Sequence, residues 1–107
     1  AVDCTGTNRA GREFEEFIEA GNVDVVVIID HHQTNSRSAD IQLLDPGSSS
    51  TGEIIYLLLK TMSVDIDEDI AKNLYTTIVS DTGSFRYSNT GPVTFRDASE
   101  LVEHGAD

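Results

Sequence analysis

Two adjacent histidines, His31 and His32, follow Asp30 at the end of an apolar run, VDVVVII. Imidazole nitrogens and carboxylate oxygens together suit Mn²⁺, Fe²⁺, Co²⁺ or Zn²⁺. A metal-bound histidine usually has its second ring nitrogen held by a hydrogen bond, which Asp30 or a backbone group could supply to His31. Titratable groups at the end of a buried strand are costly unless they are paired. The tripeptide therefore predicts a metal site, the alternative being a histidine pair of which one member is simply exposed.

Two more carboxylates occupy similar positions. Asp3 closes the strand-like segment AVDC, and Asp81 lies in the segment SDTG. Each also has a structural interpretation: Asp3 as a turn residue or helix cap, and Asp81 as an Asx-turn residue with Gly83 at a positive φ. Residues 48–51 begin a helix, where they could bind an anion or act only as a cap. His104, near a helix C-terminus, is predicted to be structural.

The elements that must position these side chains alternate between strand and helix. Strands are predicted to end at Asp3 and to span 23–30 and 41–45, with a short extended piece at 85–87; helices are predicted before Gly21 and over 50–61, 67–80 and 92–105. Such alternation predicts an α/β fold with an open parallel sheet and flanking helices. Ligands of open parallel sheets bind beyond the carboxyl ends of strands. Asp3 and Asp30 both lie at such ends.

Local signals define the helix boundaries. Ser50 and Glu53 form a capping-box pattern, Asp67 is a plausible N-cap, and Pro92 fits a first helical position. The strand at 23–30 is apolar almost throughout, which favours burial of both of its faces. Apolar spacing in the last helix predicts four inward-facing residues: Phe95, Ala98, Leu101 and Val102.

The chain is a small acidic polypeptide of 107 residues with a formal net charge of −12. That length suits one small domain. Binding of long duplex nucleic acid needs a basic surface, so the charge argues against this class, although bound divalent cations would still allow a small anionic substrate. No apolar run approaches the roughly 20 residues of a membrane span. The single cysteine, Cys4, excludes an internal disulfide and predicts a reducing, cytoplasmic location.

Taken together, these segments resemble the DHH phosphoesterase superfamily, which is named for this tripeptide. The segment VVVIIDHH resembles the family signature, VDC with the following NR resembles the preceding motif, and SDTGSFRYSNTGPVTFRDASELVEHGAD resembles the next motif and its helix. The order and spacing of the motifs match over essentially the whole chain. The last stretch is most similar to the nanoRNase branch, whose members degrade very short oligoribonucleotides and dephosphorylate 3′-phosphoadenosine 5′-phosphate.

The resemblance implies a role for each matched residue. Asp3 resembles a carboxylate that bridges two metal ions, and His31 and Asp81 resemble ligands of the second ion. Asp30 resembles the residue that orients the histidine pair. His32 resembles the residue that faces the substrate phosphate or the metal pair.

Two arginines and the metal itself complete the implied site. Arg9 and Arg86 could contact phosphate or nucleotide, and a surface ion pair is the alternative for each. The family implies two divalent ions, and mixed histidine and carboxylate ligation makes Mn²⁺ the leading expectation. No serine or cysteine nucleophile is required.

The resemblance also implies that these residues are a fragment of the catalytic domain. The family's leading His-x-x-x-Asp-x-Asp motif and its C-terminal substrate-binding domain have no counterpart among residues 1–107. We therefore expect the isolated chain to bind a single metal ion weakly, to turn over little or no substrate, and to self-associate through exposed sheet edge and apolar surface.

Three functions stay open at this point. The first is a metal-dependent phosphoesterase that hydrolyses short oligoribonucleotides or a nucleoside 3′,5′-bisphosphate with a water activated by two metal ions. The second is an inorganic pyrophosphatase, exopolyphosphatase or cyclic-dinucleotide phosphodiesterase of the same superfamily. The third is a metal-binding domain without catalysis, which the retention of Asp3, His31, His32 and Asp81 disfavours.

Overall fold

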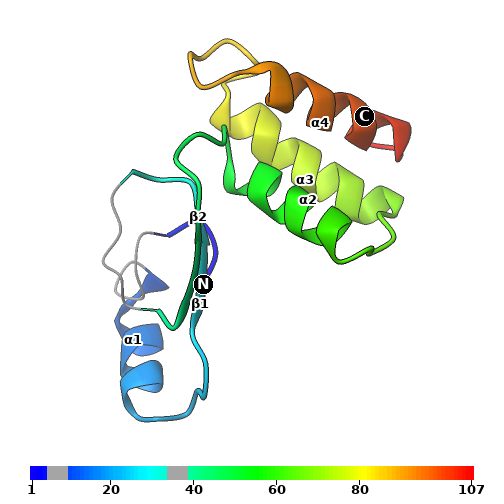
Figure 1. The fold of residues 1–107 in the computed structure, drawn as a ribbon. Helices are drawn as coiled ribbons and strands as arrows, with labels where there is room; N and C mark the ends of the chain where they lie inside the picture. The colour runs from blue at the N-terminus through cyan, green and yellow to red at the C-terminus, as the bar shows by residue number, and fades with distance from the viewer. Residues whose placement is uncertain (5–9, 34–38) are drawn as a thin grey trace. The chain divides into compact units, whose positions relative to one another are not determined.

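The computed structural model describes residues 1–4, 10–33 and 39–107. Contacts cluster in two compact units, Ala1–Pro46 and Gly47–Asp107. The elements are α1 (Arg12–Glu19), β1 (Val27–Asp30), β2 (Ile41–Leu44), α2 (Thr51–Thr61), α3 (Glu68–Asp81) and α4 (Pro92–Glu103), shown in Figure 1. The strands pair in parallel and the class is α/β, as predicted. Across the described ranges, no helix combines the length and apolar character that crossing a membrane requires.

The parallel pair β1 and β2 forms the centre of the first unit. Its register runs from Val27 opposite Ile41 to Asp30 opposite Leu44. Strand β1 begins at Val27, so the predicted start of this strand at residue 23 is wrong. The side chain of Asp40 explains the difference, because its Oδ2 accepts the backbone N–H of residue 26 at 2.8 Å in place of a strand partner.

The first residues of the chain run beside β1. Val2 forms a parallel bridge with Ile29, and the Asp3 backbone N–H donates to the Ile29 carbonyl at 2.9 Å. Because all three segments run in the same direction, Asp3 and Asp30 meet at one edge, the carboxyl end of the sheet. The opening residues therefore join the sheet only through an isolated bridge at an exposed Val2, and the predicted strand that ends at Asp3 is not formed among the described residues.

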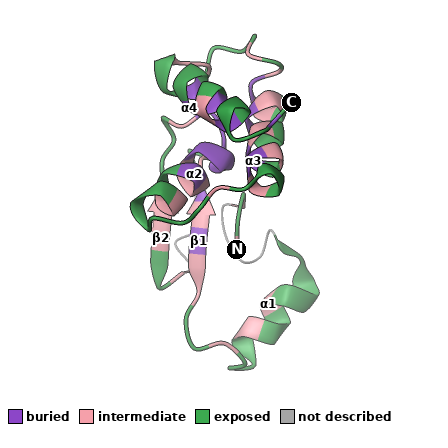
Figure 2. Cartoon of the chain, turned by 90° about the vertical axis from the view of Figure 1, so that its right-hand side faces the viewer, coloured by how far each residue is buried: buried purple, intermediate pink, exposed green. Residues whose placement is uncertain are grey.

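Burial in the first unit follows the pleat of β1. Ile28 and Asp30 are buried, whereas Val27 and Ile29 are half-buried (Figure 2). Within this unit only one face of β1 is buried, so the expectation that both faces are covered is not met there. Helix α1 is present as predicted, and none of its residues is buried in the structure described.

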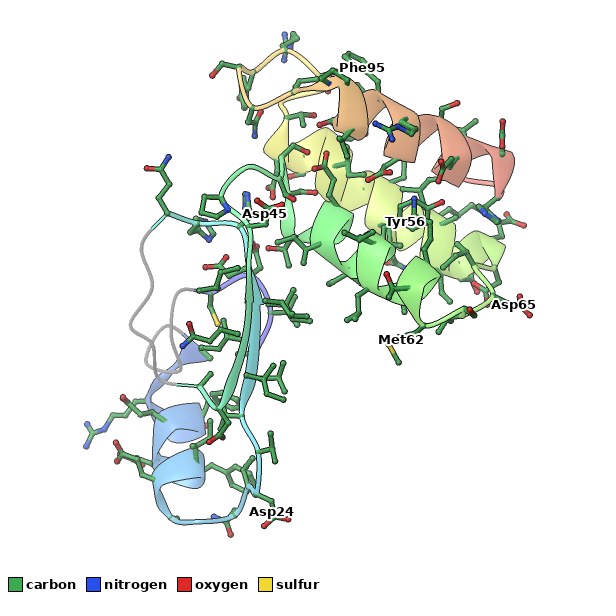
Figure 3. All side chains as sticks on the ribbon, in the orientation of Figure 1. Asp24, Asp45, Tyr56, Met62, Asp65 and Phe95 are labelled. Carbon is green, nitrogen blue, oxygen red and sulfur yellow. The ribbon has the colours of Figure 1, made fainter. Side chains whose placement is uncertain are left out.

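The second unit is a three-helix bundle whose helices begin at the predicted caps. The Ser50 hydroxyl accepts the Glu53 N–H before α2, Asp67 accepts the N–H of Ile70 before α3, and Pro92 is the first residue of α4. The core lies between the three helices, and Figure 3 labels its buried tyrosine, Tyr56. It consists of Tyr56, Ala71, Leu74, Ile78, Leu101 and Ala106.

Two predictions in this unit are wrong. Phe95 and Val102 are exposed rather than inward, and Thr94 and Asp97 are buried in their place. The expected extended piece at 85–87 is a tight turn, in which Phe85 has a φ of 63°. The pattern of apolar residues does not reveal the left-handed turn at residues 83–85, and nothing in the structure explains the exposure of Val102.

Candidate metal centre

The edge where the sheet segments end brings together two of the predicted ligands, Asp3 and His31, with His32, which was predicted to face the substrate phosphate or the metal pair. Asp3, His31 and His32 each offer a ligand atom, and these atoms all lie within 4.8 Å of one another. Asp3 Oδ1 is 3.6 Å from His31 Nε2. Two ligands of one ion lie at most about 4.2 Å apart when each bond is about 2.1 Å, so this pair already fits a single cation. The Asp3 and His32 side chains are about half exposed, and a modest rotation can close the wider separations.

Asp30 forms a contact with each of the two histidines. Its side chain is fully buried, and Oδ1 accepts the His31 backbone N–H at 2.9 Å and contacts His32 Nδ1 at 2.6 Å. A carboxylate only accepts, so Nδ1 of His32 carries the proton and Nε2 is left to bind a cation or a phosphate oxygen. This geometry is compatible with the predicted role of Asp30 in orienting the histidine pair. The ring that Asp30 contacts is that of His32 rather than that of His31.

The backbone at Asp3 is strained in a way that suits a ligand. Asp3 has a φ of 58°, in the left-handed region that aspartate adopts more readily than most side chains. Strained residues persist where surrounding contacts hold them, and they cluster at functional sites. Here the Asp3 N–H bond to Ile29 fixes the residue at the strand end.

The donor set fits a divalent transition-metal ion. Two imidazoles and one carboxylate match the preference of Mn²⁺, Fe²⁺, Co²⁺ and Zn²⁺. A buried carboxylate behind one imidazole is the usual outer support of such a ligand. Within the described residues, Asp30 Oδ2 is buried and has no hydrogen-bond partner, and a nearby cation would offset the cost of burying this carboxylate.

Asp81 belongs to the second unit, and it is the last residue of α3 rather than a loop residue. A helix C-terminus favours cations, and the last turn of α3 contains no basic residue. A carboxylate at this position is therefore disfavoured by the helix dipole unless a cation is close. The role of Asp81 as a ligand stays a prediction.

The predicted substrate residues lie in different situations. Arg86 is exposed, and its Nε donates to the Gly83 carbonyl at 2.9 Å, so the turn after Asp81 anchors one edge of the guanidinium. Arg9 lies outside the described residues. Of the segment at 48–51, Ser50 acts as the cap of α2, while Ser49 donates through its backbone N–H and hydroxyl to the carboxylate of Glu53 at 3.0 and 2.5 Å.

Sequence reasoning missed one residue next to the predicted ligands. Asn89 donates through Nδ2 to the carbonyl of Asp81 at 3.0 Å and to that of Ser49 at 3.1 Å. The signal available in the sequence was weak, since an asparagine just before Thr-Gly-Pro reads simply as a loop residue.

Comparison with known proteins identifies the family. Residues 1–80 match the sequence model of the DHH family, N-terminal domain. The chain belongs to the DHH family. The bifunctional oligoribonuclease and PAP phosphatase NrnA of Thermus thermophilus is 38% identical over 80 residues, which are 75% of this chain and 25% of that protein. The resemblance read from the DHH tripeptide is therefore confirmed, including its similarity to the nanoRNase branch.

Two further similar proteins extend the comparison. A probable manganese-dependent inorganic pyrophosphatase of Streptococcus equi subsp. equi is 34% identical over 100 residues, 85% of this chain and 30% of that protein. The crystal structure of an exopolyphosphatase-related protein from Bacteroides fragilis superposes with a TM-score of 0.84 at 29% identity, covering 98% of this chain and 31% of that one. The chain thus spans between a quarter and a third of the length of these relatives.

Proposed function

We propose that this chain is part of the catalytic domain of a metal-dependent phosphoesterase that cleaves short oligoribonucleotides or removes phosphate from a nucleoside 3′,5′-bisphosphate. The observation that carries the proposal is the cluster of Asp3, His31 and His32, with Asp30 buried behind it. Membership of the DHH family and similarity to an oligoribonuclease and PAP phosphatase support the substrate class. We further propose that residues 1–107 are the part of this domain that follows its first metal-binding motif.

Each residue has a chemical task in this proposal. A divalent cation, when bound, supplies an acidified water and neutralises charge on the phosphoryl group. Asp3 and His31 would hold it, and we propose Asp81 as a further ligand. Asp30 keeps the proton of His32 on Nδ1. Nε2 of His32 would then either complete the metal site or face the phosphoryl group, where charge grows during the reaction.

We propose Mn²⁺ as the metal, two ions in the complete site, and a small phosphorylated substrate as the partner. The ligand chemistry and the manganese-dependent relative support the metal. The formal charge of −12 favours cation capture and disfavours long nucleic acids. Arg86, and Arg9 earlier in the chain, remain proposed phosphate contacts, and the cytoplasm remains the proposed location.

Hydrolysis of pyrophosphate or polyphosphate is the second candidate. The pyrophosphatase relative and the exopolyphosphatase-related structure favour it. The two candidates differ in whether a nucleoside is needed for hydrolysis, which a substrate panel can decide directly.

Phosphate release by the complete natural polypeptide that carries these residues tests the proposal. Short RNA, 3′-phosphoadenosine 5′-phosphate and pyrophosphate are each supplied with Mn²⁺ or with a chelator. We expect Mn²⁺-dependent release from the first two, lost in Asp3→Asn and His31→Gln. The matched control is His104→Gln, which alters an exposed histidine at the C-terminus of α4. Release from pyrophosphate alone would replace the first candidate by the second, and metal-independent release would refute both.

A further inference from the structure

The turn between α3 and α4 reverses the chain directly after Asp81 (Figure 1). Three consecutive residues, Gly83, Ser84 and Phe85, have φ values of 56°, 60° and 63°. Only the glycine adopts this left-handed conformation without a steric cost. A phenylalanine and a serine held there indicate that other contacts impose the shape.

Thr82 supplies those contacts. Its side chain is fully buried; Oγ1 donates to the Ile78 carbonyl at 2.6 Å and accepts the Phe85 N–H at 2.9 Å. Its carbonyl accepts the N–H groups of Arg86 and Tyr87, each at 2.9 Å. Thr82 therefore holds the left-handed turn through its side chain and its carbonyl, and connects the turn to the last turn of α3.

Because of this turn, Asn89 lies next to Asp81. Its Nδ2 group donates to two carbonyls, that of Asp81 at 3.0 Å and that of Ser49 at 3.1 Å. The carbonyl of the last helical residue has no partner within its own helix, so a side-chain donor fixes its direction. Ser49 is itself buried and bonded to Glu53, and it is therefore a firm anchor.

We infer that Asn89 is a positioning residue: it ties the backbone of Asp81 to the buried Ser49 segment and so sets the direction in which the Asp81 carboxylate points. The inference rests on the proposed function in one respect, the role of Asp81 as a metal ligand. The strain at Ser84 and Phe85 is maintained by Thr82, and one consequence of this geometry is that the Asn89 amide reaches Asp81 from eight residues away.

Mn²⁺ titration by calorimetry of the complete natural polypeptide tests the inference, with Asn89→Ala as the first variant. We expect about a tenfold loss of affinity, the lower end of the range for residues that support a metal ligand. The d–d absorption of the Co²⁺-loaded protein should shift as well, because the carboxylate then approaches the ion differently. Thermal unfolding of the metal-free protein should change little. Asn89→Ser, which keeps one donor, should give an intermediate affinity.

Asn73→Ala is the matched control, because Asn73 is an exposed asparagine of α3 whose Nδ2 donates to the Asp69 carbonyl at 2.8 Å. It should leave both the affinity and the Co²⁺ spectrum unchanged. Asp81→Asn separates the two hypotheses. If Asp81→Asn weakens Mn²⁺ binding and Asn89→Ala does not, the inference fails and the proposed ligand stands. If Asp81→Asn binds Mn²⁺ normally, Asp81 is not a ligand, and both the proposed ligand role of Asp81 and the positioning role of Asn89 fail.

Discussion

Replacing Asp30 by asparagine separates metal affinity from fold stability. The Asp30 Oδ1 atom accepts the His31 backbone N–H and contacts His32 Nδ1 at 2.6 Å, in a position without solvent exposure. Asparagine keeps the shape but removes the charge, and charge-assisted hydrogen bonds are roughly twice as strong as neutral ones. The imidazole of His32 then becomes a poorer ligand. We expect Mn²⁺ affinity to fall about 10- to 100-fold, or about 1.4–2.7 kcal/mol.

Stability of the metal-free protein should not fall in parallel. Asp30 Oδ2 is buried without a hydrogen-bond partner among the described residues, so the native protein holds a costly carboxylate there. Its neutralisation offsets the weakened bonds to the histidines, and the free energy of unfolding should change by less than about 1 kcal/mol.

Calorimetric Mn²⁺ titration and urea unfolding without metal measure the two quantities on the same samples. Asp40→Asn is the matched control, since Asp40 also accepts a backbone N–H in the first unit, that of Val26 at 2.8 Å. It should leave Mn²⁺ affinity unchanged. The reasoning is refuted if Asp30→Asn binds Mn²⁺ as tightly as the native protein while Asp3→Asn and His31→Gln bind it weakly.

Three further predictions concern the helical unit. Gly52→Ala should lower the free energy of unfolding, measured in urea, by about 1–3 kcal/mol, because the added Cβ would lie 1.8 Å from Thr77 Oγ1. A change below about 0.5 kcal/mol, the size expected of an ordinary surface substitution, would contradict this prediction. Burial raises the pKa of Asp97 above its unfolded-state value, so its stabilising contribution is present at low pH and is lost as pH rises through the raised pKa. Asp97→Asn should therefore raise the thermal midpoint at pH 7 but not at pH 3, and equal shifts at both would exclude this cause. Tyr56→Phe removes the hydroxyl that donates to Glu100 at 2.9 Å and should cost about 1 kcal/mol in chemical unfolding, whereas native-like stability would show that the bond contributes nothing.

The helices of the second unit could be predicted because local chemistry fixes their starts. Ser50 and Asp67 accept backbone N–H groups at the first turns of α2 and α3, and Pro92 opens α4, each where the sequence indicated. The capping box was only half right. Glu53 turns to the backbone and hydroxyl of Ser49 rather than to the Ser50 N–H, a choice between neighbouring donors that spacing does not determine.

The region around the 82–91 turn could not be predicted because tertiary contacts override local preference there. A positive φ at Phe85 contradicts its intrinsic preference, and Thr82 imposes it. Phe85 then stacks on Phe95 with ring centroids 5.5 Å apart, which keeps Phe95 on the outer side of α4. Thr94 faces inward instead and accepts the Gly91 N–H at 3.2 Å. Apolar periodicity predicts that Phe95 lies in the core, because it does not take the stacking of Phe95 on Phe85 into account.

At the candidate metal centre, the sequence predicted which residue types meet at which edge of the sheet, and the structure adds how Asp30, His31 and His32 contact one another. The third residue, His32, returns its ring to the side chain of the first, Asp30. The middle residue, His31, gives its backbone N–H to Asp30 and directs its ring to Asp3 on the neighbouring segment. One buried carboxylate thus orients two imidazoles through two different groups, a backbone amide and a ring nitrogen. Because both contacts depend on strict adjacency, the tripeptide is informative as a unit, and neither a lone histidine nor a separated pair at this strand end would predict the same site.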